Sequence, residues 1–232
     1  MNEDSSGNTI IRFFHVYKRY GAKNALADIT LDITENEFII VTGPSGAGKT
    51  TLLKLLYLGE TVSEGQILIE GNNLSRIPRK GIPFLRRSLG IIFQDYKLIP
   101  TKTVFENIAL ALEVTGNKRG FIQKKVGSLL RTVGMESRSN AYPPSLSGGE
   151  QQRIAIARAV ASGPRIILAD EPTCSLDSES AEVIIGLLKE FHERGATVIV
   201  STHDRELIRD AKCRVIHLKE GAIQPLSKAI TI

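Results

Sequence analysis

The octapeptide Gly43-Pro44-Ser45-Gly46-Ala47-Gly48-Lys49-Thr50 decides the fold of this 232-residue chain. Two glycines with four residues between them, followed by Lys and Thr, form the pattern of a phosphate-binding loop. The glycines let backbone N–H groups close around phosphate oxygens, and the following helix adds its N-terminal dipole. We expect Lys49 to reach the β- and γ-phosphates of a nucleotide and Thr50 to offer its hydroxyl to Mg²⁺.

The segments on either side of this loop predict the two elements that a phosphate-binding loop connects, a buried strand and a helix. The apolar run Phe38–Val41 predicts a strand buried on both faces. A helix is expected to begin at Lys49, because four leucines between 52 and 56 supply one buried face. The alternative, a glycine-rich turn that only caps a helix, does not need this context. The predicted nucleotide-binding residues of the loop are Gly43, Pro44, Ser45, Gly46, Ala47, Gly48, Lys49, Thr50 and Thr51.

A second motif is the apolar run Ile166–Ala169, which is followed directly by Asp170 and Glu171. A parallel strand here delivers both carboxylates to its C-terminal end, where α/β sheets bind ligands. We expect Asp170 to hold the Mg²⁺ shell and Glu171 to polarise the attacking water. Two carboxylates at a strand end can instead cap the next helix. The phosphate loop in the same chain favours the catalytic interpretation.

The third motif, Leu146-Ser147-Gly148-Gly149-Glu150-Gln151-Gln152-Arg153, opens a helix with a serine and two glycines. By the same dipole argument this helix end is a second anion site. One chain would then have one nucleotide loop and two phosphate-binding helix ends. A simple resolution is that the second end serves a nucleotide held by another copy. A serine-capped helix with a flexible entry is the alternative, and it explains the serine but not the whole octet.

The rest of the chain predicts an α/β fold with a helical insertion. Strands are expected at Ile10–Tyr17, Ala25–Ile33, Asn36–Thr42, Glu64–Glu70, Arg165–Ala169, Thr197–Ser201 and Arg214–Leu218. Helices are expected at Val104–Val114 with Thr103 as N-cap, Phe121–Val133, Glu150–Ser162, Ser178–Glu193 and Arg205–Ala211. Alternation of strand and helix predicts a parallel sheet with crossover helices.

The domain boundaries follow from these elements. We expect a single domain at 9–225, with an α/β core at about 9–93 and 163–225 and a helical subdomain at about 95–162. Residues 1–8 and 226–232 are expected to be tails. The fold class is α/β, a phosphate-loop (RecA-like) core with a mixed sheet, an inserted α-helical subdomain and an N-terminal antiparallel β part.

Composition and charge exclude several classes of protein. Hydrophobic residues make up 42% and charged residues 24%, which excludes disorder for most of the chain. The pI near 9.2 fits binding to nucleic acid, anionic lipid or nucleotide phosphate, although a solvated basic face is the simpler interpretation. No apolar run approaches the ~18 residues of a membrane span, and the acidic, polar start is unlike a signal peptide. Cys174 and Cys213 have neither metal-type nor disulfide-type spacing, so we expect a cytosolic protein.

The octet resembles the signature of the ATP-binding cassette family, and the motifs of that family follow in order along nearly the whole chain. The resemblance implies that Ser147, Gly148, Gly149 and Glu150 act in trans on the nucleotide of a second copy. It also implies that Tyr20 stacks on adenine, that Gln94 senses Mg²⁺ and γ-phosphate, that His203 contacts γ-phosphate, and that Asp177 lies in a loop at the dimer interface. Without the resemblance, Tyr20 is more simply an edge-strand residue and His203 a capping or solvent residue.

Within that family the chain is similar to the FtsE cell-division ATPases. The segments that carry this resemblance are Phe93–Val104, Ala109–Gly116, Ile82–Arg87 and Ala169–Thr173. Cys174 is a departure, because FtsE-type sequences usually have Gly there. The resemblance implies an ATPase that uses ATP and Mg²⁺ and forms a homodimer in the ATP state. It also implies a location at the cytoplasmic face of the inner membrane, bound to an FtsX-like membrane protein that regulates cell-wall hydrolases, with no nucleic acid partner.

Other functions stay open at this point. The cassette of a lipoprotein-releasing or macrolide-type exporter looks much alike. A soluble cassette protein that acts on nucleic acid or ribosomes would use the basic cluster, but it usually has a coiled-coil insertion or two cassettes, which this chain lacks. Intact Lys49, Asp170, Glu171 and His203 argue against a scaffold without chemistry. The basic cluster consists of Arg76, Arg79, Lys80, Arg86 and Arg87.

Overall fold

The computed structural model describes residues 8–204 and 213–225. The predicted helix Arg205–Ala211 and the predicted tails, apart from Asn8, lie outside the described residues. The chain divides into two compact units, Met1–Pro83 with Ile199–Ile232, and Phe84–Val198.

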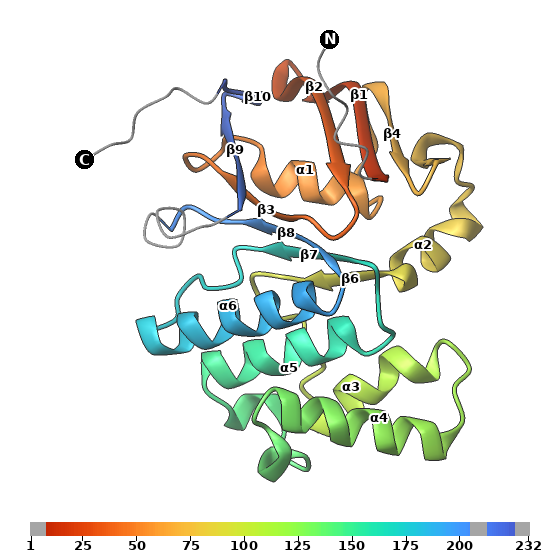
Figure 1. Cartoon of the computed structure of the whole chain (residues 1–232), viewed down its shortest axis with the longest axis vertical. Coiled ribbons are helices and arrows are strands. Elements are labelled where there is room, and N and C mark those ends of the chain that lie inside the picture. The colour runs from red at the N-terminus through yellow and green to blue at the C-terminus, as the bar shows by residue number, and fades with distance from the viewer. Residues whose placement is uncertain (1–7, 205–212, 226–232) are drawn as a thin grey trace. The chain divides into compact units, whose positions relative to one another are not determined.

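An antiparallel sheet of four strands belongs to the first unit (Figure 1). Its strands, in the order β2-β1-β4-β5, are β1 (Thr9–Tyr20), β2 (Lys23–Thr34), β4 (Glu64–Ile69) and β5 (Asn72–Asn73). Ile11, Phe13 and Val16 of β1 are fully buried, and Leu26 and Ile29 of β2 pack from the neighbouring strand. This sheet is the N-terminal antiparallel part that the alternating sequence predicts.

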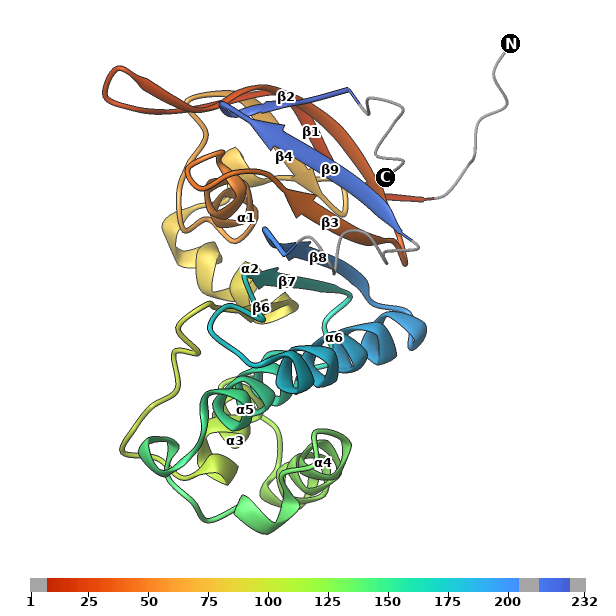
Figure 2. The same ribbon diagram turned by 90° about the vertical axis from the view of Figure 1, so that its left-hand side faces the viewer.

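The α/β part of the first unit carries the phosphate loop. Hydrogen bonding orders its strands as β10-β9-β3-β8, in which β3 and β9 are parallel and β10 and β9 are antiparallel. The sheet is therefore mixed, as expected. The helix α1 follows β3 and lies beneath the antiparallel sheet (Figures 1 and 2). These elements are β3 (Phe38–Thr42), α1 (Lys49–Leu56), β8 (Thr197–Ser201), β9 (Arg214–Lys219) and β10 (Ala222–Ile223).

The second unit contains two strands, and the division between the units falls within β8. The strands β6 (Leu89–Ile92) and β7 (Ile166–Asp170) are parallel. Strand β6 was not predicted, because it has only four residues and Gly90 interrupts its apolar pattern. The structure explains that glycine: a Cβ at position 90 would come within 2.9 Å of Pro164 and 3.0 Å of the Ala159 carbonyl oxygen. Close packing therefore requires glycine at position 90, and this glycine weakens the strand pattern in the sequence.

Three helices, α3, α4 and α5, pack together in the second unit, and α6 runs beside α5 (Figures 1 and 2). Thr103 caps α3 in a capping box with Glu106, which confirms the predicted N-cap. Ile108, Leu112 and Ile154 are buried between these helices. The helices are α2 (Ile82–Ser88), α3 (Val104–Glu113), α4 (Arg119–Thr132), α5 (Gly148–Val160) and α6 (Ser178–Glu193), with short 3-10 turns at Leu74–Arg76, Arg79–Gly81, Glu136–Arg138 and Pro143–Ser145.

Candidate functional site

The phosphate loop connects β3 to α1 and needs its glycines for two different reasons. Gly43, Gly46 and Gly48 all have positive φ, at 149°, 78° and 107°, where a side chain is unfavourable. Space is also restricted, because a Cβ on Gly43 would lie 2.1 Å from the Leu218 carbonyl oxygen. A Cβ on Gly48 would lie 2.5 Å from the Ala25 carbonyl oxygen. The loop is thus a tight backbone cradle at a helix N-terminus without acidic residues in its first turn, as anion binding requires.

Lys49 points back into this loop. Its side chain is only 7% exposed, and Nζ donates hydrogen bonds to the carbonyl oxygens of Gly43 at 2.9 Å and Pro44 at 3.4 Å. The ammonium is therefore held where the loop's own backbone surrounds it. Thr50 and Thr51 follow in the first turn of α1 and are partly exposed.

Tyr20 ends β1 with a ring that is 45% exposed. The ammonium of Lys18 lies 4.9 Å from the ring centroid and also pairs with Glu60 at 2.8 Å. The hydrogen bond from Lys18 holds the pKa of the Glu60 carboxyl below its usual range. An exposed aromatic ring next to a fixed cation fits a stacking platform for a base.

His203 follows β8, close to the start of the phosphate loop within the first unit. The backbone N–H of Thr202 donates to the Val41 carbonyl oxygen at 3.0 Å, so residue 203 lies near the chain two residues before Gly43. The His203 side chain is exposed. Strand pairing, rather than any local sequence feature, places this histidine near the loop.

In the second unit, Gln94 lies just after β6, and Asp170 is the last residue of the neighbouring parallel strand β7. The last paired residues are Ile92 of β6 and Ala169 of β7, so both chains leave the sheet at the same edge. Gln94 Nε2 lies 3.5 Å from the sulfur of Cys174, in the loop after β7. The structure thus brings the residues after β6 and after β7 together at the carboxyl ends of parallel strands.

Glu171 has a backbone conformation that is uncommon for a residue with a side chain. Its φ is 47°, in the left-handed region. Its carbonyl oxygen accepts a hydrogen bond from the Cys174 N–H at 3.1 Å, which closes a turn. Such conformations cost on the order of 1–3 kcal/mol and gather at functional sites, so this geometry supports a role beyond helix capping for Glu171. The helix cap after this loop is a different residue, Asp177.

The signature octet forms the N-terminus of α5. Ser147 is the N-cap: its Oγ accepts from the Glu150 N–H at 3.2 Å, and Glu150 accepts from the Ser147 N–H at 2.8 Å. This capping box is the structural role that the serine alone predicts, and the hydroxyl proton remains able to donate. Gly149 is required by space, because a Cβ there would lie 2.8 Å from the Ser180 hydroxyl of α6.

Asp177 is the N-cap of α6. Its carboxylate accepts from the Ser180 N–H at 2.8 Å and from the Ser180 hydroxyl at 3.0 Å. These hydrogen bonds hold the pKa of the Asp177 carboxyl below its usual range. Because Ser180 also faces Gly149, the loop 175–177 and the signature helix meet at one serine side chain.

Of the metal ligands predicted from the sequence, Thr50 lies in the first unit, and Gln94 and Asp170 lie in the second. Hard oxygen ligands of this kind suit Mg²⁺. Within the described ranges 8–204 and 213–225, no group of three His, Cys, Asp or Glu side chains forms a metal cluster.

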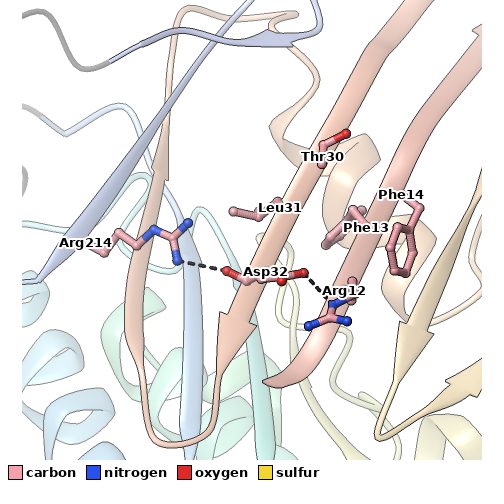
Figure 3. A pocket seen from close by; sticks show the side chains of 7 residues that line it. All are labelled: Arg12, Phe13, Phe14, Thr30, Leu31, Asp32 and Arg214. Carbon is pink, nitrogen blue, oxygen red and sulfur yellow. Dashed lines mark hydrogen bonds and ion pairs between the residues drawn. The ribbon is translucent and has the colours of Figure 1, made fainter. Parts of the chain in front are cut away.

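A shallow cavity of about 410 Å³ lies over β1 and β2, and it contains no predicted site residue (Figure 3). Asp32 is at its centre, with Arg12 Nε at 2.8 Å from its carboxylate and Arg214 Nη1 at 2.9 Å from its carbonyl oxygen. Arg214 also pairs with Glu37 at 3.1 Å. The charges in this cavity bind one another, so it is a structural cluster and not a candidate site.

Sequence reasoning missed two polar residues that shape the segment after Gln94. Arg158 of α5 donates to the carbonyl oxygens of Lys97 at 2.6 Å and Tyr96 at 2.7 Å. Asn107 of α3 is fully buried and binds both the N–H and the carbonyl of Ile99. A polar residue on the buried face of a predicted helix was the available signal for Asn107. No local pattern indicates Arg158.

Comparison with known proteins identifies the class. Residues 26–174 match the family model described as "ABC transporter". Among solved structures, a dimeric post-hydrolysis state of the ATP-binding cassette MJ0796 bound to ADP and Pi has a TM-score of 0.85 and 36% identity, covering 93% of this chain and 97% of that one. The cassette cbiO1 from Clostridium perfringens has a TM-score of 0.86 and 30% identity, with 94% and 88% covered.

The curated relatives narrow the class further. "Cell division ATP-binding protein FtsE" of Bacillus subtilis (strain 168) is 44% identical over 216 residues, which is 92% of this chain and 94% of that protein. The protein of the same name from Escherichia coli (strain K12) is 43% identical over 213 residues, covering 91% and 96%. The chain therefore belongs to the ABC transporter family and, within it, to the FtsE proteins. No helix in the described part of the chain has the length and apolarity to span a bilayer.

Proposed function

We propose that this chain is the ATP-binding and ATP-hydrolysing subunit of an ABC complex in cell division, and that its ATP cycle drives an FtsX-like membrane protein. The observation that carries the proposal is the cradle at Gly43–Thr50, whose backbone excludes any side chain at Gly43 and Gly48. Family membership and the names of the FtsE relatives support the cell-division role over that of an exporter cassette.

For ATP, the loop residues bind and Glu171 assists the chemistry. Backbone N–H groups of the loop surround the phosphates, Lys49 moves from the Gly43 carbonyl to the β- and γ-phosphates, and Tyr20 stacks on the base. Glu171 accepts a proton from the attacking water, and His203 contacts the γ-phosphate. Thr50, Gln94 and Asp170 would hold Mg²⁺, which would supply charge neutralisation at the phosphates.

Two copies of the chain would complete each site. The free N–H groups at the start of α5, with the Ser147 hydroxyl, then bind the phosphates of the partner's nucleotide. Dimeric structures of a cassette that is 36% identical to this chain support the arrangement. The Ser180 hydroxyl binds Asp177 of the loop 175–177, which is proposed to lie at the dimer interface, and it also lies next to Gly149 of α5. Both elements would therefore respond together when a second copy binds.

The membrane partner is proposed to dock on Tyr96–Pro100, the segment just after Gln94. Leu98 and Ile99 are each partly exposed, and they give this exposed segment two adjacent apolar residues. The alternative is that both residues only pack beneath the helices; Asn107 holds the backbone of Ile99 by two hydrogen bonds. We infer that Leu98 receives a short helix of the membrane protein in the helix-in-groove manner. The protein would then lie at the cytoplasmic face of the membrane.

Co-purification tests this function. We expect the full chain, expressed with its FtsX-like membrane protein, to be recovered from membranes with that protein, and Leu98→Glu to abolish the recovery while ATP binding persists. Val114→Glu is the matched control, because Val114 is an exposed apolar residue of the same unit outside the segment. Normal recovery of Leu98→Glu with the membrane protein would show that the docking surface lies elsewhere. An unfolded Leu98→Glu variant would support the alternative that Leu98 only packs beneath the helices. Failure of the purified chain to hydrolyse ATP, alone or with its partner, contradicts the proposed function itself.

A further inference from the structure

Both ends of α5 contact the same short segment of the chain. Near the C-terminal end of the helix, the two terminal nitrogens of Arg158 donate to the carbonyl oxygens of Lys97 and Tyr96 at 2.6 and 2.7 Å. At the N-terminal end, a Cβ on Gly148 would lie 3.0 Å from the Tyr96 hydroxyl. The ten residues from Gly148 to Arg158 correspond to about 15 Å of helix. Tyr96 therefore has one contact near each end of α5.

The segment itself has an unfavourable backbone. Tyr96 and Lys97 have φ values of 59° and 49°, two consecutive left-handed residues that are not glycine. A Cβ disfavours this conformation, and two in a row require an external restraint. The carbonyl groups of these two residues are the acceptors that Arg158 binds. The ion pair of Lys97 with Asp95 is exposed on both sides and restrains little.

The arginine is well suited to this restraint. Its planar guanidinium presents two parallel N–H donors, so it can hold two carbonyl groups in a fixed relation, which lysine cannot do. The side chain is half-buried, and desolvation lowers the pKa of its guanidinium, so the contact with the carbonyl groups replaces lost water. Asn107 holds the far end of the segment at Ile99. The segment is thus fixed at both ends by polar side chains from two helices.

We propose that Arg158 is a positioning residue for ATP hydrolysis, which sets the left-handed turn at Tyr96-Lys97 and so fixes Gln94 relative to the signature end of α5. This inference rests on the proposed function, because it assumes that Gln94 and the signature glycines both act on nucleotide. Arg158 touches no nucleotide. It determines where the segment after Gln94 lies. It thereby also sets the position of the Tyr96 hydroxyl next to Gly148, at the start of α5.

The test is a rescue experiment on the full chain. Arg158→Met removes the donors, and we expect kcat for ATP hydrolysis to fall on the order of tenfold while ATP affinity of the monomer stays within about twofold. Lys97→Gly removes the unfavourable Cβ from the turn, so in the Arg158→Met background it should restore most of the lost kcat. Hydrogen exchange of a peptide covering residues 95–99 should rise in Arg158→Met, because the restraint is lost.

Controls separate this role from general packing. Arg153→Met removes another half-buried arginine of α5, whose Nη1 donates to the Val133 carbonyl at 3.3 Å, and Lys97→Gly should recover none of what that variant loses. Arg158→Lys keeps the positive charge but lacks the two parallel N–H donors of the guanidinium. It replaces Arg158→Met in the same experiment if that variant does not fold. Unchanged kcat in the folded variant, or a loss that Lys97→Gly does not reverse, overturns the proposal. A wild-type chain that does not hydrolyse ATP defeats the proposed function instead, so the two failures are distinct.

Discussion

The amide of Gln94 contacts the sulfur of Cys174 at 3.5 Å, across 80 residues of sequence. The contact joins the end of β6 to the loop after β7, where Glu171 and Asp177 lie. Sulfur is a weak acceptor, but here it faces the Nε2 side of the amide and leaves Oε1 for another ligand. Cys174 thus touches a residue proposed to sense the nucleotide.

Replacing Cys174 should change how Gln94 responds to Mg²⁺. Cys174→Ser keeps a small acceptor, so we expect the Mg²⁺ concentration for half-maximal ATP hydrolysis to stay within about twofold. Cys174→Gly removes the acceptor, and this concentration should rise roughly two- to tenfold, the equivalent of one net hydrogen bond. Titration of the ATPase rate with Mg²⁺ measures both effects. Identical titrations for the Gly, Ser and wild-type chains would show that the contact has no role.

Glu171→Gln should leave ATP binding intact and reduce hydrolysis by a factor of ~10²–10⁴, the usual contribution of a general base. The variant should also accumulate as an ATP-bound dimer, because the step that separates the copies is lost. Lys49→Ala provides the contrast: ATP affinity itself should fall roughly 10- to 100-fold, since a charge-assisted contact to phosphate is removed. Single-turnover hydrolysis and equilibrium binding distinguish the two. Near-normal cleavage by Glu171→Gln removes that residue from the role.

Gly149→Ala should spare ATP binding by the monomer and prevent ATP-dependent dimerisation. The added Cβ would approach the Ser180 hydroxyl to 2.8 Å and displace it from Asp177. In a head-to-tail dimer, a Gly149→Ala chain mixed with a Lys49→Ala chain can place both defects in one site and leave the other intact. The mixture should therefore hydrolyse ATP faster than either variant alone. Equal losses of ATP affinity in the two isolated monomers would indicate a site within one chain.

The Asp177 cap should make the start of α6 sensitive to acid. The hydrogen bonds from Ser180 lower the pKa of this carboxyl in the folded chain. Its contribution to stability is therefore present above its unfolded pKa, near 3.9, and is lost as the pH falls through the folded value. Asp177→Asn keeps an acceptor without the titration. Thermal unfolding between about pH 2 and pH 5 should show a steeper acid loss for the wild type than for Asp177→Asn, and parallel curves would exclude the effect.

Much of the fold was predictable because its signals are local. The alternation in β1 and β2, the leucines of α1 and the capping box at Thr103 each depend on residues within a turn or two. Strand β6 was missed because Gly90, which close packing against Pro164 requires, removes the apolar pattern from four residues. The short β10 was missed because two residues carry no periodicity.

The sequence alone determined that a phosphate loop stands between a buried strand and a helix, because glycine, lysine and threonine at fixed spacing meet a local backbone requirement. It also indicated Asp170 and Glu171 at a strand end. Only the tertiary structure decided that Gln94 meets Cys174, that Gly149 faces Ser180, and that Arg158 holds the left-handed turn at Tyr96-Lys97. These contacts join residues 31 to 80 positions apart, and packing of whole elements, which no local pattern encodes, brings them together.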